Sequence, residues 1–388
     1  MKFDPEKYVN KTVSEIPPSG IRRFFDIAAD MDDVVSLGVG EPDFVTPWHI
    51  RDEGIYSLEK GHTHYTSNYG LRELRIEIAK YVKRRFNLEY DGLKQTLVTV
   101  GGSEAIDLFL RTVLSPGDEV LIPEPCFVCY SPITKFAGGV PVPVETKAEN
   151  EFRLKPEDIE AKITDKTKVL VLPYPNNPTG AIMEKEDLEA IAPVIEKHDL
   201  LVLSDEIYAE LTYGEKRHVS IASIDGMYDR CMIVSGFSKA YAMTGWRLGY
   251  AVGNEHIIKM MTKVHQFAIM SAPTMSQYAA IEALRNGDED IEYMREEYDE
   301  RRKIIVDGFN SMGLECFEPK GAFYVFPSIK KSGLSSMDFC EKLLYANKVA
   351  VIPGTAFGAC GEGFIRCSYA YSVESILTAL ERIEDFVK

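Results

Sequence analysis

The chain has 388 residues, of which 45% are hydrophobic and 27% are charged, so a large buried core can form. At roughly 150 residues per domain, this length predicts two or three lobes. The net charge of −16 disfavours a nucleic-acid-binding protein, because such proteins normally show a basic surface.

The first residues lack an apolar stretch typical of a secretory signal, and no run of about 18 apolar residues predicts a membrane span. We therefore expect a cytoplasmic protein without a membrane partner. The seven cysteines are scattered, which disfavours a disulfide framework. Cys126 and Cys129 form a C-x-x-C pair, but no second cysteine pair accompanies them, so we predict no metal site.

Apolar periodicity and turn residues predict the elements in chain order. We expect a helix over 21–31, a short strand from 34, a helix over 71–86, a strand over 96–100 and a helix over 104–114. Strands follow over 119–123, 141–145, 168–172, 200–205, 232–235 and 247–252, with a helix over 184–198 between them. Helices over 273–285 and 288–312 lead to strands over 322–326, 349–352 and 364–369, with helices over 336–346 and from 373.

Strands alternating with helices predict an α/β fold with a mainly parallel sheet, followed by a smaller α+β lobe. Ligands of such sheets bind beyond the carboxyl ends of the strands. Gly101-Gly102-Ser103, Asn177, Asp205 and Lys239 each follow a predicted strand. This arrangement predicts a ligand site independently of any family.

Lys239 lies in Ser235-Gly-Phe-Ser238-Lys239-Ala-Tyr-Ala-Met-Thr-Gly-Trp-Arg247. A lysine amine that forms a Schiff base needs a lowered pKa, which a nearby guanidinium can supply. Arg247 and Ser238 are donors expected around a phosphate. A lone Ser-Lys pair, however, is usually an exposed loop.

The whole segment closely resembles the Schiff-base segment of class I/II aminotransferases, which hold pyridoxal 5′-phosphate. The strings Tyr174-Pro-Asn176-Asn177-Pro178-Thr-Gly180 and Ser204-Asp205-Glu206-Ile-Tyr208 resemble further motifs of this family. So do Gly321-Ala-Phe-Tyr324 and the triplet from Arg366 to Ser368. The resemblance covers the chain from about Val13 to its end. It points to the archaeal and bacterial subgroup that includes aspartate and aromatic aminotransferases.

The resemblance implies fold type I, with a large domain built on a mixed, mainly parallel seven-stranded sheet and a smaller α+β domain. We assign residues 1–48 to an N-terminal segment and part of the small domain, 49–285 to the large cofactor-binding domain and 286–388 to the small domain. It also implies a homodimer with shared active sites.

Site roles follow from the resemblance. Lys239 would form the Schiff base and act as base, Asp205 would pair with the ring nitrogen, and Asn177 and Tyr208 would bond the phenolic oxygen. Phe127 would stack on the ring. Phosphate would be held by Gly102, Ser103, Ser238, Arg247 and, from the neighbouring subunit, Tyr65. Arg366 would clamp the substrate α-carboxylate and Gly40 would lie in the segment covering the substrate.

Several of these residues also have an ordinary structural interpretation. Asp205 at a strand end is often a helix N-cap, Asn177-Pro178 is a common turn, and Phe127 fits a core position. On a helix after Asp205, Tyr208 would share a face with it, because it lies three residues on.

The implied activity is transfer of the α-amino group of aspartate or an aromatic amino acid to 2-oxoglutarate by a ping-pong mechanism. A C–S β-lyase of the same fold and a broad-range or alanine aminotransferase remain alternatives. Two departures bear on this activity: Gly236 stands where many relatives carry Ser or Thr, and Ser103 where some acidic-substrate relatives carry Lys. An additional arginine for a side-chain carboxylate is not evident from the sequence.

Overall fold

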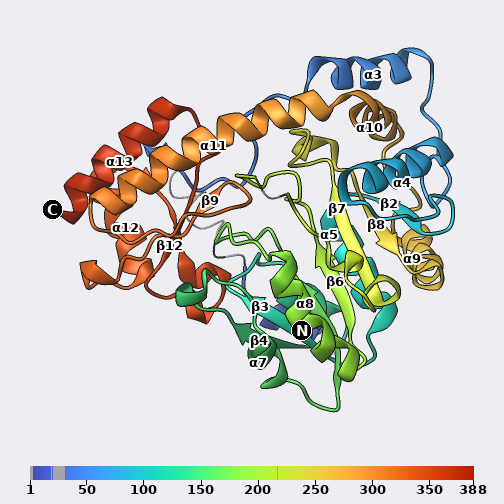
Figure 1. The fold of residues 1–388 in the computed structure, drawn as a ribbon, viewed down its shortest axis with the longest axis horizontal. Coiled ribbons are helices and arrows are strands. Elements are labelled where there is room, and N and C mark those ends of the chain that lie inside the picture. The colour runs from blue at the N-terminus through green and yellow to red at the C-terminus, as the bar shows by residue number, and fades with distance from the viewer. Residues whose placement is uncertain (1–2, 19, 21–30, 216) are drawn as a thin grey trace.

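The computed structural model describes residues 3–18, 20, 31–215 and 217–388. The helix expected over 21–31 falls, except for residue 31, outside this described part. Within it, a seven-stranded sheet has the order β2-β8-β7-β6-β5-β3-β4 (Figure 1). The prediction of an α/β fold is confirmed.

The strands of the large sheet are β2 (Thr96–Thr99), β3 (Glu119–Glu124), β4 (Val140–Glu145), β5 (Thr167–Leu172), β6 (Leu201–Asp205), β7 (Cys231–Gly236) and β8 (Gly249–Gly253). β3 to β7 pair in parallel, whereas β8 runs antiparallel to both β2 and β7. β2 therefore points the same way as β7, and the carboxyl ends of six strands lie at one edge.

Helices lie on both sides of this sheet (Figure 1), and the first of them in the chain, over residues 48–59, packs against another helix instead of the sheet. Their bounds are α3 (Trp48–Glu59), α4 (Arg72–Phe86), α5 (Gly102–Val113), α6 (Tyr130–Phe136), α7 (Pro156–Glu160), α8 (Lys185–Lys197), α9 (Glu255–Ala268) and α10 (Thr274–Asn286). α5 packs against α9, and its buried side chains include Ile106, Leu108 and Phe109. Burying each such side chain is worth about 1.5–3 kcal/mol. The packing fixes the first turn of α5 over the strand ends.

The second lobe lies at the other end of the molecule and is reached along α11 (Asp288–Ser311), the long helix in Figure 1. It contains α12 (Ser336–Asn347), α13 (Val373–Val387) and the strands β9 (Tyr324–Val325), β10 (Val349–Ala350), β11 (Ile352–Pro353) and β12 (Ile365–Ser368). β12 lies between β11 and β9 and pairs with both. β1 (Val35–Ser36) pairs with β10, so the chain just before Gly40 joins this lobe. The proposed domain boundaries stay a prediction.

Several elements differ from expectation. No helix follows Asp205: residues 207–210 form a turn, so Tyr208 does not share a helix face with it. The strand expected over 322–326 is shorter, because Ala322 has a φ of 56°, which extended backbone does not adopt. The strand expected over 349–352 is divided into β10 and β11, which belong to different sheets.

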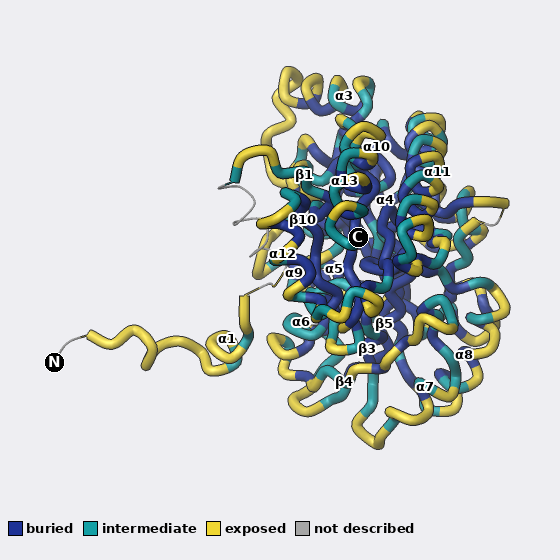
Figure 2. The backbone as a smooth tube through the Cα atoms, turned by 90° about the vertical axis from the view of Figure 1, so that its left-hand side faces the viewer, coloured by how far each residue is buried: buried dark blue, intermediate teal, exposed yellow. Residues whose placement is uncertain are grey.

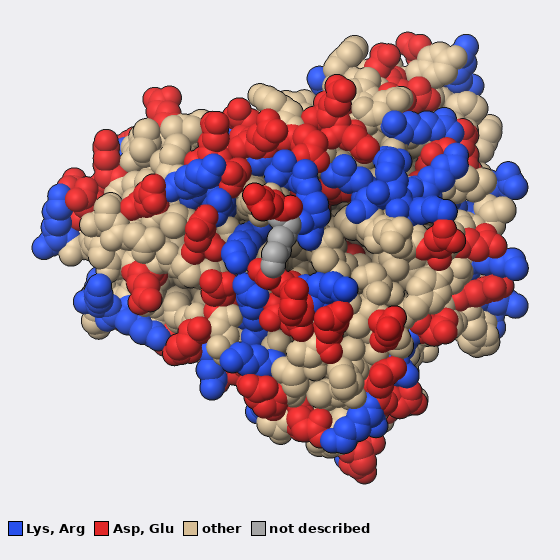
Figure 3. All heavy atoms as spheres, in the orientation of Figure 1, with Lys and Arg blue, Asp and Glu red and all other residues tan. Residues whose placement is uncertain are grey.

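The described residues before α1 (Lys11–Glu15) extend away from the body of the protein (Figure 2), whereas α1 itself contacts α6. Acidic and basic side chains are interspersed on the face shown in Figure 3. None of the helices in the described part of the chain is long and apolar enough to cross a membrane.

Candidate active site

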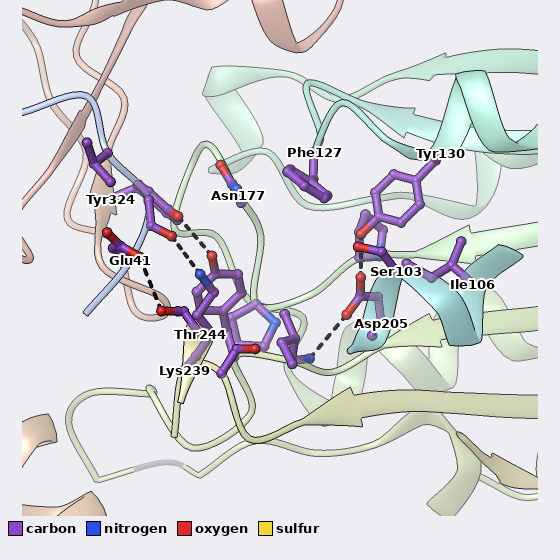
Figure 4. Close-up of a pocket in the computed structure, with 18 of the residues that line it drawn as sticks. Glu41, Ser103, Ile106, Phe127, Tyr130, Asn177, Asp205, Lys239, Thr244 and Tyr324 are labelled. Atoms are coloured by element: carbon purple, nitrogen blue, oxygen red, sulfur yellow. Dashed lines mark hydrogen bonds between the residues drawn. The ribbon is translucent and has the colours of Figure 1, made fainter. Parts of the chain in front are cut away.

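A cavity of about 420 Å³ lies at the carboxyl-end edge of the large sheet, a size typical of small-molecule sites. Its lining includes eleven of the residues singled out from the sequence: Gly40, Gly102, Ser103, Phe127, Asn177, Asp205, Tyr208, Ser238, Lys239, Arg247 and Arg366. They come from both lobes and from the N-terminal segment. Figure 4 shows labelled members of this set arranged around the space.

Lys239 follows β7, and its Nζ donates to the Gly40 carbonyl oxygen at 2.6 Å. The amine also lies 5.7 Å from the centre of the Tyr208 ring. Loss of water around the amine lowers the pKa of Lys239 to about 8, with Glu41 opposing this shift and Arg366 and Arg247 adding to it. The neutral amine, which is the nucleophilic form, is therefore accessible near physiological pH.

Asp205 ends β6, the central strand, and its carboxylate is buried. Oδ2 accepts from the Tyr130 hydroxyl at 2.7 Å, and Oδ1 accepts from the Ile207 N–H at 3.2 Å. Burial raises the pKa of Asp205 to about 6, whereas the two hydrogen bonds oppose that rise. No ion pair to Asp205 is found within the described ranges, so its buried carboxylate is suited to a cationic partner in the cavity.

Another wall of the cavity forms where the backbone of β8 closely contacts the loop before α5. A Cβ on Gly249 would lie 2.6 Å from the Gly102 nitrogen, so only glycine permits this approach. Gly101 has a φ of 77° and starts α5 without a side-chain cap. The first N–H groups of α5 thus stay available, as in helix termini that bind anions.

Arg247 and Ser238 line the cavity beside this helix terminus. Arg247 adopts the left-handed region, with a φ of 51°, and its guanidinium donates to the Thr244 carbonyl oxygen at 3.0 Å. A Cβ on Gly101 would lie 2.7 Å from an Arg247 nitrogen, which places the guanidinium next to the first turn of α5. This cluster presents one positive charge and several donors, a set suited to a phosphate. A side chain at Gly236 would meet β8 backbone at 2.9 Å, which explains the glycine there.

Arg366 on β12 is 2% exposed and donates to Asn177 Oδ1 at 3.0 Å and to the Gly38 carbonyl oxygen. Its Nε has no hydrogen-bond partner, and no ion pair to Arg366 is found among the residues that the structure describes. Its plane stacks on Tyr324 and Phe357, with its central carbon 4.7 and 4.8 Å from the ring centres. A buried guanidinium left without a carboxylate is suited to an anionic ligand.

Tyr208 and Tyr324 place two hydroxyl groups 2.8 Å apart at the same cavity. Phe127 lies partly exposed on the wall that Figure 4 shows beside Asn177, and its ring meets Tyr130 edge-on at 6.3 Å. Tyr65, in contrast, does not line the cavity of this chain and is 81% exposed.

Sequence reasoning missed several lining residues, among them Tyr130, Tyr324, Glu41 and Thr244. Tyr324 stands inside the string Gly321-Ala-Phe-Tyr324, Tyr130 follows Phe127 by three residues, and Glu41 follows Gly40 directly. The two tyrosines did not indicate a role in a site, because a tyrosine beside a strand is usually part of the core. Thr244 donates to Glu41 at 3.2 Å, which joins the N-terminal segment to the loop after Lys239.

Comparison with known proteins gives consistent matches. A family model described as aminotransferase class I and II matches residues 32–383. An aspartate aminotransferase of Pyrococcus abyssi is 48% identical over 96% of both chains. Aromatic-amino-acid aminotransferase 2 of Thermococcus litoralis is 45% identical over 96% of both. The solved aromatic aminotransferase of Pyrococcus horikoshii matches with a TM-score of 0.90 and 45% identity, covering 94% of this chain and 98% of that one.

Proposed function

The chain belongs to the class I and II aminotransferases, and we propose that it binds pyridoxal 5′-phosphate in this cavity and moves an α-amino group to 2-oxoglutarate. The proposed donor is aspartate or an aromatic amino acid. The buried guanidinium of Arg366 has no ion-pair partner in the described part of the chain and lines the same cavity as Lys239. It carries this proposal, because it provides a carboxylate site next to a reactive amine.

The residues present fit this cofactor. The first turn of α5, Ser238 and Arg247 form the anion site, suited to the phosphate. Asp205 is a buried carboxylate that a protonated ring nitrogen would neutralise. Asn177 and Tyr208 supply polar groups for the phenolic oxygen, and Phe127 an aromatic face for the ring. Lys239 supplies the amine that attaches the aldehyde.

When bound, the cofactor supplies an electron sink that stabilises a carbanion at the substrate α-carbon. The chain's own residues would do the rest. Arg366 would orient the substrate by its carboxylate. Lys239 Nζ would take the α-proton of the substrate and would deliver a proton to the cofactor carbon that bore the aldehyde. Gly40, whose carbonyl oxygen accepts from Lys239, would help to exclude water above the reacting atoms.

The relatives at 45–48% identity are named for aspartate and for aromatic amino acids, which supports both donor classes here. In the described part of the chain, the cationic lining residues are Lys239, Arg247 and Arg366, and each has a proposed role. No further cation of this lining would face a side-chain carboxylate, which favours a broad or aromatic preference over strict aspartate specificity.

Absorbance-monitored half-reactions test this proposal. Cofactor-loaded protein is mixed separately with aspartate, glutamate, phenylalanine and alanine, and conversion of the cofactor to its aminated form is followed. We expect conversion by phenylalanine, reversed by 2-oxoglutarate. Product release without dependence on a keto acid would instead indicate a lyase and would contradict the proposal.

We also propose a homodimer with shared active sites. Tyr65 projects into solvent from a loop that is held in place: Thr274 donates to the His64 carbonyl oxygen at 2.8 Å, and Gln277 donates to Thr66 at 3.0 Å. Large apolar side chains are also exposed: Trp48, Ile55, Tyr56 and Leu58 precede Tyr65 in sequence, and Phe267, Ile269, Met270 and Met275 flank in sequence the Thr274 that bonds to the Tyr65 loop. Exposed apolar surface of this kind marks an interface.

Subunit mixing tests the shared site. If Tyr65 serves the neighbouring cavity, a hybrid of a Lys239→Ala subunit and a Tyr65→Ala subunit contains one site with both residues intact. We expect activity to appear when the two weakly active variants are mixed and allowed to exchange. Continued absence of activity in confirmed hybrids would contradict sharing. The assignment of 49–285 and 286–388 to two domains and the cytoplasmic location stay predictions.

A further inference from the structure

Among the residues that the structure describes, Tyr130 alone donates a side-chain hydrogen bond to the Asp205 carboxylate, and it has no role in the function proposed above. It is the first residue of α6 and is 2% exposed. Its hydroxyl points at Asp205 Oδ2 in Figure 4, at 2.7 Å. The phenol is a neutral donor, because burial and then Asp205 raise the pKa of Tyr130 well above its ordinary value.

The segment that carries Tyr130 is itself held in place. The Cys126 N–H donates to the Phe357 carbonyl oxygen at 3.0 Å, and Asn176 donates to the Pro125 carbonyl oxygen at 3.3 Å. The Phe127 ring meets the Tyr130 ring edge-on. One short segment thus supplies both an aromatic face to the cavity and a fixed donor to the buried carboxylate.

Few other hydrogen bonds hold the Asp205 carboxylate. Besides Tyr130, only the Ile207 N–H donates to it in the described part of the chain. The titratable groups that influence it, or that it influences, are Tyr130 and Cys129 at the start of α6, Glu206 beside it, Tyr208 in the following turn and Lys239 after β7. Glu206 favours the protonated form of Asp205, whereas Lys239, Tyr130 and Ile207 favour the ionised form.

Building on the proposed cofactor, we propose that Tyr130 is a positioning residue that keeps the Asp205 carboxylate ionised for pairing with the cofactor ring nitrogen. A hydrogen bond to an ionised group is stronger than one to its neutral form. Loss of the hydrogen bond from Tyr130 therefore favours the protonated carboxyl group of Asp205. That group is neutral and does not stabilise a proton on the ring nitrogen electrostatically.

The test is the pH dependence of the dissociation constant of pyridoxal 5′-phosphate, measured by titrating apoprotein, for wild type and Tyr130→Phe. The wild-type affinity should fall as the pH drops through about 6, where Asp205 becomes protonated. In Tyr130→Phe this fall should start about one pH unit higher. Below both midpoints the variant should bind about tenfold more weakly, and above both the difference should vanish.

This pattern separates positioning from general destabilisation, which would weaken binding at every pH. The ionisable groups of the cofactor gain and lose protons in the same way with both proteins. Their effect on the dissociation constant therefore cancels when the two pH profiles are compared. Tyr81→Phe is a matched control, because Tyr81 is also buried and donates to a buried carboxylate, that of Glu210, outside the cavity lining. It should leave the midpoint unchanged. An unshifted midpoint in Tyr130→Phe, or an equal shift in Tyr81→Phe, would overturn the proposal.

Asp205→Asn gives a second check, since this variant has no carboxyl to titrate. Adding Tyr130→Phe to it should cause no further change in the pH profile, and a further shift would contradict the inference. Infrared difference spectra of the apoproteins, wild type against Asp205→Asn, report the carboxyl directly without cofactor. A wild-type carboxyl still protonated at neutral pH would also refute the inference. Failure of wild type to bind pyridoxal 5′-phosphate at all would instead overturn the proposed function, and this inference with it.

Discussion

Tyr208, in the turn after β6, and Tyr324, on β9 of the small lobe, place their hydroxyl groups 2.8 Å apart. This hydrogen bond links the large sheet to the small lobe at the cavity wall. Tyr324 also lies against Arg366 and so close to Gly40 that a Cβ there would meet its hydroxyl at 2.5 Å. One side chain therefore touches residues proposed to serve cofactor and substrate.

Tyr324→Phe removes this hydroxyl and keeps the ring on Arg366. We expect kcat to fall by about fivefold, because Tyr208 loses the bond that orients its hydroxyl, a loss of about 1 kcal/mol. Steady-state kinetics check this expectation. Tyr369→Phe is the control, since Tyr369 is equally buried and donates to the Ala322 carbonyl oxygen at 3.1 Å without touching Tyr208. An equal loss in both variants would show that only the lobe's packing matters.

Lys239→Ala should lower turnover by about 10⁴-fold, the upper range for loss of a general base. Lys239→Arg keeps the positive charge but presents no amine to the cofactor, and should fail equally. The exposed Lys263→Ala serves as a control for loss of a lysine. Single-turnover absorbance with phenylalanine measures all three variants. Ordinary activity in Lys239→Ala would refute the assignment.

Attachment of the cofactor aldehyde to Lys239 should depend on pH. Since the pKa of Lys239 is lowered to about 8, the amine is neutral above that pH and protonated below it. The rate of attachment to apoprotein should therefore rise with pH up to about 8 and then level off. Stopped-flow absorbance at several pH values provides the measurement. A rate that kept rising toward pH 10 would indicate an ordinary lysine.

Arg366→Lys should lower kcat/KM by about 10²-fold, because a single ammonium cannot reproduce the fork that holds a carboxylate with two hydrogen bonds. Arg366→Gln should lose more. The melting temperature should not fall in parallel with kcat/KM. The guanidinium has no ion-pair partner in the described part of the chain, and burial lowers the pKa of Arg366. Kinetics and thermal melting of the same variants compare the two effects. Parallel loss of both would argue for a structural role.

His49, at the start of α3, joins two helices: its Nδ1 lies 2.7 Å from Glu282 of α10 and its Nε2 2.9 Å from Asp290 of α11. Burial alone would lower the pKa of His49, but the bonds to Asp290 and Glu282 raise it overall. The stabilisation by the protonated ring is thus complete below about pH 6.5 and is lost as the pH rises through the folded-state pKa. His49→Gln should reduce the melting temperature more at pH 6 than at pH 9. A reduction independent of pH would contradict this linkage.

Much of the fold could be predicted from the sequence, because apolar runs such as that of β5 and the turn residues after them are local signals. Asp205, Asn177 and Lys239 could be placed together for the same reason, since each follows a strand of one parallel sheet. Local signals failed where a residue adopts a backbone conformation that is unusual for its type, as Ala322 does with its positive φ. They also failed in the turn after Asp205.

The sequence by itself determined the family, the order of the strands and helices and the set of reactive residues, because these depend on residue types at fixed spacing. Only the tertiary structure decided which neutral side chains complete the site. Tyr130 and Asp205 are 75 residues apart, and Arg366 and Asn177 are 189 apart. Their contacts depend on how α6 and β12 pack against the large sheet. Packing of distant elements, unlike helical or strand periodicity, leaves no repeating pattern along the chain.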